Sequence, residues 1–303
     1  MFHENRKKEN INMEYDSKSK NKGKKRPISI FLILLLVFIL ISECRKSSSS
    51  KANFIDAVKE GDYDRVEDLI EVEQNVNQVD HKTEDTPLIL AIKKRDTKMV
   101  KILLDAAADV NKKGAIVAPI HSVSYGCQYD IMKLLIKAKV DLENTERWNN
   151  ATPLEITASN GHIECVKLLV ENGARIDRLP FKNFISHLAS RGYKEIIEYL
   201  IEKGVYLDQK ELNQALIYAA RDGYIDIVKL LINKNADINA VDNYGNSVLY
   251  SASTKGGEEV VKLLISLGAE VNTKNMHGKT ALDRATQDNN EIIITMLKNA
   301  GAN

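Results

Sequence analysis

Apolar residues recur along this chain in short runs whose internal spacing is that of a helix with one buried face. Val100 to Leu104 reads Val-Lys-Ile-Leu-Leu, and Val166 to Leu169 reads Val-Lys-Leu-Leu. Each run predicts an amphipathic helix. One charged position in these runs repeats at steps of 32, 34, 31, 31 and 33 residues: Lys101, Lys133, Lys167, Glu198, Lys229 and Lys262. A period of about 33 residues predicts a solenoid in which helical units stack on their neighbours.

The ends of these helices carry residues with a conformational reason to be there. Thr86-Pro87-Leu88 and Thr152-Pro153-Leu154 place a capping hydroxyl before a proline at the first helical position. Glycine after a second helix, as in Gly173-Ala174, takes the left-handed conformation that ends it. We expect eight units over 52–303, which begin near Ala52, Asp85, Val117, Ala151, Lys182, Asn213, Asn246 and Lys279.

These motifs resemble the ankyrin-repeat family. Several units combine Thr-Pro-Leu, Gly-His, Val-Lys-Leu-Leu and an Asp-Val-Asn or Asp-Ile-Asn turn, and the resemblance covers about 52–303. It implies an all-α repeat solenoid of stacked helix-turn-helix units with short β-hairpin loops. It also implies structural roles in turns or hydrogen bonds, and not in metal binding, for Asp109, Asn111, His121, His162, Asp237 and Asn239.

Three units depart from the pattern. Units five and six lack Thr-Pro and follow at steps of 31, which predicts a short or absent hairpin near 178–180 and 206–208. Unit three has Ala118 before Pro119, without a capping hydroxyl. Ala107 and Lys139 stand where glycine should end the second helices of units two and three, and a side chain there costs roughly 1–2 kcal/mol. Glycine at either position should therefore raise thermal stability.

Charge is distributed unevenly between the N-terminal segment and the repeats. Residues 1–26 contain nine Lys and Arg against four Asp and Glu, whereas residues 45–303 contain 34 against 37. The repeats are close to neutral, which argues against nucleic-acid binding through a basic surface.

The basic N-terminal segment indicates targeting. Lys24-Lys25-Arg26 precede an apolar run of fourteen residues from Ile28 to Ile41, interrupted only by Ser29. This is the length of a signal-peptide core, because a spanning helix usually needs about 20 residues. The basic flank should stay in the cytoplasm while the chain after Cys44 is exported. Met13 is an alternative start that would leave a more ordinary basic region.

Cys44 ends the apolar run and precedes Ser47 to Ser50. Leu40-Ile41-Ser42-Glu43-Cys44 resembles a bacterial lipoprotein signal, from which Glu43 departs because the residue before the cysteine is normally small. Three alternatives follow: lipidation of Cys44, an uncleaved anchor, or a segment that is plainly secreted or not a targeting signal at all. We accordingly divide the sequence into a targeting segment (1–44), a Ser-rich tether (45–51) and the repeat domain (52–303).

Two further cysteines lie in the repeats. The repeat pattern puts Cys127 at a turn of unit three and Cys165 in the second helix of unit four. We expect these sites to be separated by a repeat step plus about a turn of helix, beyond the ~7 Å Cα limit for bridging. The prediction is therefore two unpaired thiols.

Catalytic chemistry is not indicated by the sequence. The histidines and cysteines lack zinc-ligand spacing, and the glycines fall at helix ends and not in a phosphate-binding loop. His121 and Cys127 are six residues apart in one unit and should face different ways. We expect a protein that is not an enzyme, needs no cofactor, and binds neither a small-molecule substrate nor nucleic acid.

The resemblance places partner binding at hairpin tips and on the inner face of the first helices. The tip residues include Lys82, Thr83, Trp148, Asn149, Asn243, Tyr244, Met276 and His277. The inner-face residues are Lys93, Lys94, Tyr125, Asn160, Arg191, Arg221 and Lys255. Trp148 is either an exposed interface anchor or folded back on the next hairpin. The basic inner residues either indicate an acidic partner surface or are simply solvated.

Taken together, these features predict a monomeric, non-enzymatic scaffold that is exported and tethered to a bacterial membrane, facing the periplasm or the exterior. It would bind a partner protein through its tips and concave side. Two alternatives remain: an accessory or protective factor for an exported enzyme, and a secreted effector that binds host proteins.

Overall fold

The computed structural model describes residues 53–179 and 183–303. Residues 52–303 form one compact body. The expectations for 1–44, for the tether at 45–51 and for lipidation of Cys44 lie outside the described residues. No helix of the described residues is long and apolar enough to cross a membrane.

Eight helix pairs follow one another through the described residues, one pair for each expected unit. The pairs are α2 (Phe54–Glu60) with α3 (Tyr63–Glu71), α4 (Pro87–Lys93) with α5 (Thr97–Asp105), α6 (Pro119–Ser124) with α7 (Tyr129–Lys137), α8 (Pro153–Ser159) with α9 (Ile163–Glu171), α10 (Phe184–Ser190) with α11 (Lys194–Glu202), α12 (Gln209–Asp222) with α13 (Ile225–Asn233), α14 (Val248–Ser251) with α15 (Gly257–Ser266), and α16 (Ala281–Gln287) with α17 (Glu291–Asn299). A single 3₁₀ turn, η1 (Ile176–Arg178), follows α9, and a π-helical turn, η2 (Ala252–Gly256), joins α14 to α15.

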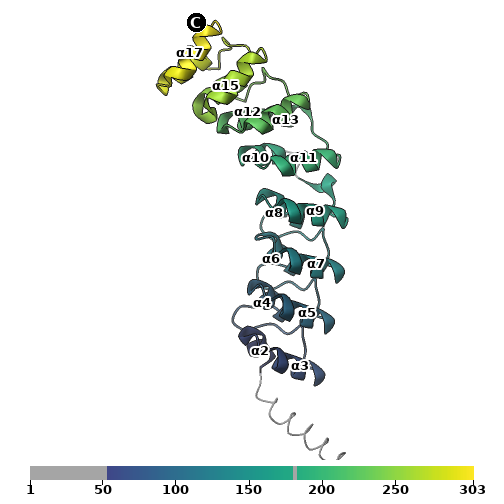
Figure 1. The fold of residues 1–303 in the computed structure, drawn as a ribbon. Helices are drawn as coiled ribbons and strands as arrows, with labels where there is room; N and C mark the ends of the chain where they lie inside the picture. The colour runs from purple at the N-terminus through teal and green to yellow at the C-terminus, as the bar shows by residue number, and fades with distance from the viewer. Residues whose placement is uncertain (1–52, 180–182) are drawn as a thin grey trace, which may run out of the picture. The chain divides into compact units, whose positions relative to one another are not determined.

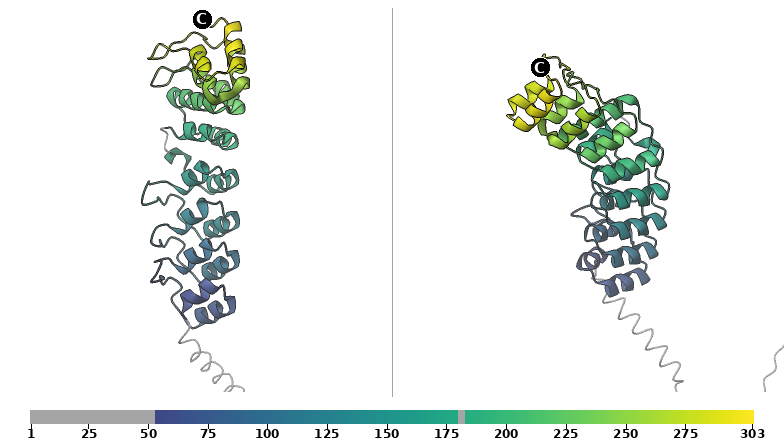
Figure 2. Two further views of the ribbon diagram at one scale, coloured as in Figure 1. Left: turned by 90° about the vertical axis from the view of Figure 1, so that its left-hand side faces the viewer. Right: turned by 45° about the horizontal axis from the view of Figure 1, so that its top comes forward.

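The pairs stack so that first helices lie on one side and second helices on the other (Figure 1). Loops project on one side near the N-terminal end of the stack and again from the two C-terminal units (Figure 2). The described residues contain no strand, only the bridge between Val241 and Ser247. The predicted solenoid is confirmed. Its hairpin loops consist of turns, without a β-sheet among the described residues.

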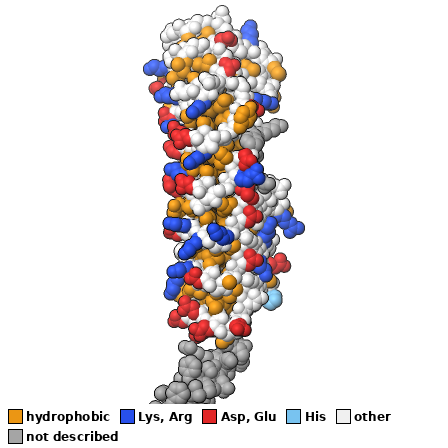
Figure 3. All heavy atoms as spheres, turned by 90° about the vertical axis from the view of Figure 1, so that its right-hand side faces the viewer, with side chains coloured by type: hydrophobic (Ala, Val, Ile, Leu, Met, Phe, Trp, Pro, Cys, Tyr) orange, Lys and Arg blue, Asp and Glu red, His pale blue; other side chains and the backbone are white. Residues whose placement is uncertain are grey.

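One continuous core runs through the stack because each helix buries its apolar stripe against the adjacent unit. Leu88, Ile92 and Leu103 are fully buried in unit two, as are Leu154 and Leu169 in unit four. The second-helix side keeps a column of apolar side chains between charged ones (Figure 3). Such burial supplies most of the stability of short helices, since helices of seven to nine residues are marginal alone.

The helix ends confirm the predicted repeat pattern. Thr86 accepts a hydrogen bond from the Ile89 N–H at 3.3 Å, whereas Ala118 makes no side-chain cap for α6. Ala107 and Lys139 adopt left-handed backbone conformations with φ of 60° and 64°. Both therefore occupy the glycine position that the sequence indicated.

The Asp-x-Asn turns connect successive units by hydrogen bonds. The Asp109 carboxylate accepts from the Asn111 N–H at 2.9 Å, and the Asn111 side chain accepts from the Asp141 N–H of the next unit at 2.9 Å. Glu143 does the same for the Arg175 N–H at 2.9 Å. Similar bonds recur in units six and seven, where Asn239 accepts from Glu270 N–H at 2.9 Å. These residues are thus turn and inter-unit connectors.

Unit six begins earlier than predicted. Helix α12 starts at Gln209 and not near Asn213, because Asp208 caps it by accepting from the Glu211 N–H at 2.7 Å. The extra turn places Glu211 against α10 of unit five, whose first residue follows Asn183, a position without a side-chain cap. The Glu211 carboxylate accepts from the Asn183 N–H at 2.7 Å and the Ser186 N–H at 3.0 Å. Unit six therefore provides the cap that unit five lacks.

The prediction of two unpaired thiols is wrong. Cys127 and Cys165 form a disulfide, with their Cα atoms 5.9 Å apart. Cys127 occupies the left-handed turn position of unit three, with φ of 41°, and Gly161 is its counterpart in unit four, with φ of 80°. A Cβ built on Gly161 would lie 2.6 Å from the Tyr193 ring of the following unit. A side chain at this turn thus points at the start of the next unit's second helix, where Cys165 lies, and the assumed extra helical turn of separation does not exist.

Candidate protein-interaction surface

The loop tips present large apolar side chains to solvent. We name each loop after the unit whose first helix it precedes. Trp148 in the unit-four loop is 77% exposed, so its ring does not fold back on a neighbouring hairpin. Tyr244 in the unit-seven loop is 65% exposed and Met276 in the unit-eight loop 74%. Exposed aromatic residues on ordered turns have the character of interface anchors.

Hydrogen bonds within the unit-four loop hold Trp148 in place. The Asn149 side chain accepts from the Ala151 N–H at 2.9 Å, and Asn150 adopts a left-handed conformation with φ of 56°. The guanidinium of Arg147 lies over the indole ring, 6.0 Å from its centre. This loop therefore presents a cation and an aromatic ring side by side.

The tips of units seven and eight are joined to each other. The Met276 N–H donates to the Tyr244 carbonyl at 3.0 Å, and the Asn275 side-chain amide donates to the Asn246 side-chain oxygen at 2.7 Å. Asn243, an expected contact residue, lies exposed in the same loop as Tyr244. The two C-terminal tips thus form one rigid apolar projection.

Most of the cations expected on the inner face are engaged within the chain. Lys93 pairs with the buried Asp85 at 2.6 Å, and Lys94 donates to the Lys59 carbonyl. Arg221 pairs with Asp222 at 2.7 Å, which raises its pKa, and stacks on Tyr218 with 4.7 Å to the ring centre. These bonds reduce the positive charge that this face offers to a partner.

The other expected inner-face residues have mixed environments. Arg191 is exposed, whereas Asn160 donates its side-chain amide to the Ile156 carbonyl of its own helix at 2.7 Å. The Tyr125 hydroxyl donates to Glu146 at 2.5 Å, and burial together with that carboxylate raises the pKa of Tyr125 to about 12. The side chain of Lys255 lies outside the described part. The inner-face set is therefore not a uniform patch.

The histidines of units three and four connect neighbouring segments. His121 is buried, and its Nε2 lies 2.8 Å from the Asn144 carbonyl. Burial lowers the pKa of His121, so the ring is neutral near pH 7 and donates from Nε2. His162 Nε2 lies 3.1 Å from the Tyr125 carbonyl of the preceding unit. Both roles are structural, as the sequence pattern implied.

A feature that the sequence analysis missed is the shortened loop of unit three. Asn111 and Ala118 are 7 positions apart (118 − 111), whereas Asn77 and Thr86 are 9 apart (86 − 77), and this difference could have revealed it. The Gly114 N–H donates to the Val117 carbonyl at 3.1 Å, and a Cβ on Gly114 would lie 2.6 Å from an Asp85 oxygen. The loop thus folds back onto unit two and does not project.

A hollow remains on each side of this retracted loop. One of about 410 Å³ lies toward the unit-two loop, between Val79 to Glu84 and Lys113 to Ala115. The other, of about 270 Å³, lies toward the unit-four loop and is lined by Lys113, Gly114, Ala115, Ile116, Ala118, His121, Thr145, Glu146, Arg147 and Asn150. We call the second the Lys113–Arg147 hollow.

Comparison with known proteins decides the family. The profile described as "Ankyrin repeats (3 copies)" matches residues 54–145, 120–211, 185–275 and 216–303, which together span the described body. The chain belongs to the ankyrin-repeat family. This ankyrin array also resembles the human ASB11 ankyrin repeat domain, with a TM-score of 0.62 and 24% identity over 72% of this chain and 99% of that domain. That likeness concerns the fold alone.

Curated relatives match over a few repeats. Alpha-latrocrustotoxin-Lt1a of Latrodectus tredecimguttatus is 33% identical over 115 residues, or 38% of this chain and 8% of the toxin. The human transient receptor potential cation channel subfamily A member 1 is 29% identical over 102 residues, or 32% of this chain and 9% of the channel. The ankyrin array thus spans less than a tenth of either relative.

The ankyrin fold is generally a protein-protein interaction scaffold and not an enzyme. Within residues 53–179 and 183–303, no cluster of three or more His, Cys, Asp or Glu side chains could hold a metal ion. What the array offers chemically is therefore a shaped surface for a protein partner.

Proposed function

We propose that this ankyrin array is an exported scaffold, held at a bacterial membrane by its N-terminal segment. It binds a partner protein through its loop tips and first-helix face. The observation that carries the proposal is the Cys127–Cys165 disulfide. Disulfides persist in oxidising compartments and are rare in the cytosol, so this bond favours a location outside the cytoplasm.

The N-terminal sequence supports the same location. Lys24-Lys25-Arg26 followed by the apolar run Ile28 to Ile41 has the order of an export signal. Cys44 follows that run after Ser42 and Glu43 and is the residue that lipid would modify. We therefore propose a lipidated Cys44 with the array beyond the membrane surface.

Binding would operate by rigid presentation. Trp148 and Tyr244 stand on loops fixed by hydrogen bonds, with 2.9 Å between Asn149 and Ala151 and 3.0 Å between Met276 and Tyr244. Little conformational entropy is then lost when a partner docks on them. Lys93 and Arg221 on the inner face are already paired with Asp85 and Asp222, so they would contribute little attraction for an acidic partner surface.

Fractionation with mass analysis tests this proposal. We would express the full chain and its Cys44→Ala variant in a bacterium, alkylate free thiols before reduction, and measure the N-terminus of each form. The expected result is a membrane-bound wild type that begins at an acylated Cys44, an unprocessed variant, and no alkylation of Cys127 or Cys165.

Each other outcome has a definite meaning. Full-length wild type and variant in the membrane would indicate an uncleaved anchor. Both forms in the medium would indicate a secreted effector. A cytoplasmic chain with alkylated Cys127 and Cys165 would contradict export altogether.

A further inference from the structure

We propose that the Lys113–Arg147 hollow binds an acidic segment of the partner protein. A carboxylate of that segment lies between Lys113 and Arg147, and an adjacent apolar side chain packs on Ile116 and Trp148. This inference rests on the proposed scaffold function and names the site and the chemistry of its partner.

The hollow exists because the unit-three loop does not project. The retracted loop brings Gly114 close to Asp85, and glycine permits this approach because a Cβ there would come within 2.6 Å of a carboxylate oxygen. The row of projecting loops is therefore interrupted between units two and four. The space left, about 270 Å³, suits inserted side chains more than a drug-sized ligand, since ligand pockets are typically about 300–1,000 Å³.

The accessible charge around this hollow is positive. Lys113 and Arg147 are both exposed, and neither belongs to an ion pair seen among the described residues. Glu146 is the single carboxylate among the residues that line the hollow, and it is 6% exposed. Its Oε1 accepts the Tyr125 hydroxyl at 2.5 Å. Glu146 thus already accepts a hydrogen bond from Tyr125, whereas Lys113 and Arg147 have no carboxylate partner among the described residues.

The other titratable groups near the base of the hollow would not repel an acidic segment. His121 is buried, donates to the Asn144 carbonyl at 2.8 Å, and has a lowered pKa because of that burial. Asp85 lies under the retracted loop but pairs with Lys93 at 2.6 Å. The hollow of about 410 Å³ toward the unit-two loop differs, since it is lined by the exposed Glu84 and the buried Asp80, so its charge does not favour an acidic segment.

Exposed apolar side chains adjoin the two cations. Ile116 is 59% exposed on the retracted loop, and Trp148 follows Arg147, whose guanidinium lies over the indole ring at 6.0 Å. Because cationic and apolar side chains lie next to each other here, the surface is complementary to a partner segment in which Asp or Glu is adjacent to Leu or Phe. Opposite charge would guide the encounter, and the aromatic anchor would supply affinity. Two cations on a near-neutral body make a poor phosphate-backbone site by comparison.

A peptide-binding measurement tests the assignment. The full chain in detergent would be titrated into a dye-labelled twelve-residue peptide in which Asp and Glu alternate with Leu and Phe. A matched peptide carries Lys in place of each acid. We expect the acidic peptide to bind at least about tenfold more tightly, and less so as salt rises, because exposed charges are screened.

Matched variants locate the binding. Lys113→Glu with Arg147→Glu should weaken the acidic peptide about tenfold or more, and Trp148→Ala should weaken it by a similar factor. Lys101→Glu with Lys229→Glu, which reverses two charges on exposed second-helix positions, should change it by less than about twofold. Equal affinity for the Lys peptide, no binding of the acidic one, or insensitivity to Lys113→Glu with Arg147→Glu would overturn the assignment. Melting curves of each variant confirm folding.

A second measurement separates this site from the scaffold function itself. A photo-crosslinking amino acid is placed at 116, 148 or 244 in the full chain within the cells that naturally express it. Crosslinks from 116 and 148, competed by the acidic peptide, support the hollow. Crosslinks from 244 alone would overturn it while leaving a scaffold that uses its C-terminal tips. No protein crosslink at any position would contradict the scaffold function as well.

Discussion

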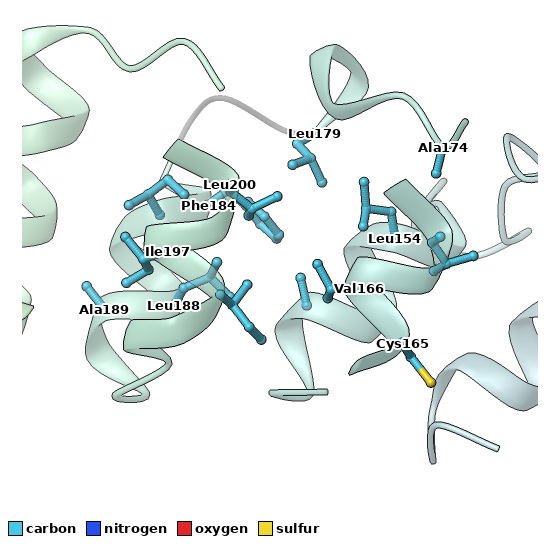
Figure 4. Packing of buried hydrophobic residues seen from close by; sticks show 14 of the residues in the cluster. Leu154, Cys165, Val166, Ala174, Leu179, Phe184, Leu188, Ala189, Ile197 and Leu200 are labelled. Carbon is cyan, nitrogen blue, oxygen red and sulfur yellow. The ribbon is translucent and has the colours of Figure 1, made fainter. Parts of the chain in front are cut away.

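Two neighbouring boundaries in this array are held together by different chemistry. Between units three and four, the Cys127–Cys165 disulfide, the contact of His162 with the Tyr125 carbonyl and the Glu143–Arg175 hydrogen bond connect the units. Between units four and five, the contact is largely apolar, through residues such as Leu154, Val166, Leu179, Phe184 and Leu188 (Figure 4).

Both boundaries involve a unit with a defective helix start. Unit three has Ala118 at the N-cap of α6, which makes no side-chain cap, unlike Thr86 and Thr152 of its neighbours. Unit five has Asn183 before α10, again without a side-chain cap. In each case the following unit compensates: Cys165 fixes unit three, and Glu211 caps unit five.

This difference shows how a repeat array distributes stability. The free energy of such an array is approximately a sum of unit terms and nearest-neighbour terms. A weak unit can therefore persist when the next unit supplies a covalent bond or a buried carboxylate. The two interactions can be distinguished by experiment, because a reductant breaks the Cys127–Cys165 disulfide and leaves the Glu211 cap intact.

Removing the disulfide should have the largest effect on this comparison. Its cysteines are 38 residues apart, and closing a loop of that length stabilises a fold by about 3–4 kcal/mol. We expect Cys127→Ala, or reduction of the Cys44→Ala chain, to lower the urea midpoint and to expose units one to three first. Hydrogen exchange resolved by unit measures this, and a reductant that leaves both midpoint and exchange unchanged would contradict it.

Removing the Glu211 cap should have the next largest effect. Glu211→Ala leaves the Asn183 and Ser186 N–H groups without their acceptor, at a cost of about 2–3 kcal/mol, since hydrogen bonds to charged groups are worth about 1.5–3. Increased exchange should be confined to α10 and its neighbours. Glu211→Gln keeps one oxygen acceptor, so its stability should lie between those of the wild type and Glu211→Ala. Glu202→Ala, on the exposed side of α11, should leave the stability nearly unchanged. A loss for Glu202→Ala equal to that for Glu211→Ala would refute the capping role.

Much of this architecture could be predicted from the sequence, because period and helix ends are local properties. The Thr86-Pro87 start and the left-handed Ala107 and Lys139 follow from the conformational needs of a helix end. The disulfide and the Glu211 cap depend on where a side chain points relative to another unit. Cys127 reaches Cys165 because a left-handed turn directs its Cβ onward, which the 33-residue pattern does not encode.

The candidate surface was only partly predictable for the same reason. The loop-tip positions of Trp148 and Tyr244 follow from their places in the repeat, whereas the exposure of the Trp148 ring, which the sequence left open, comes from the structure. The pairing of Lys93 with Asp85 and of Arg221 with Asp222 depends on side-chain reach, and it neutralises two of the cations expected on the inner face.

A smaller effect should come from Gly161 at the apolar boundary between units four and five. Gly161→Ala adds a Cβ that would lie 2.6 Å from the Tyr193 ring, in a backbone with φ of 80°, and should cost more than about 1–2 kcal/mol of conformational strain alone. Gly173→Ala is the matched control, because φ there is 99° and nothing lies within 4 Å. Thermal melts should show the larger loss for Gly161→Ala, and an equal loss would mean that the Tyr193 contact does not hold this boundary.

The smallest expected change tests whether unit three is weak in itself. Lys139 ends α7 with φ of 64° and Ala107 ends α5 with φ of 60°, so glycine at either site removes strain of roughly 1–2 kcal/mol. Part of that gain is offset because glycine loses more backbone entropy on folding, which leaves a net rise of about 1 kcal/mol or less. Lys133→Gly, in the exposed middle of α7, should instead lower stability by about 1 kcal/mol. Melting temperatures that fall for both Ala107→Gly and Lys139→Gly would show that these helix ends are not strained. If Lys139→Gly also reduces the stability lost on reduction, the disulfide compensates for this defective unit.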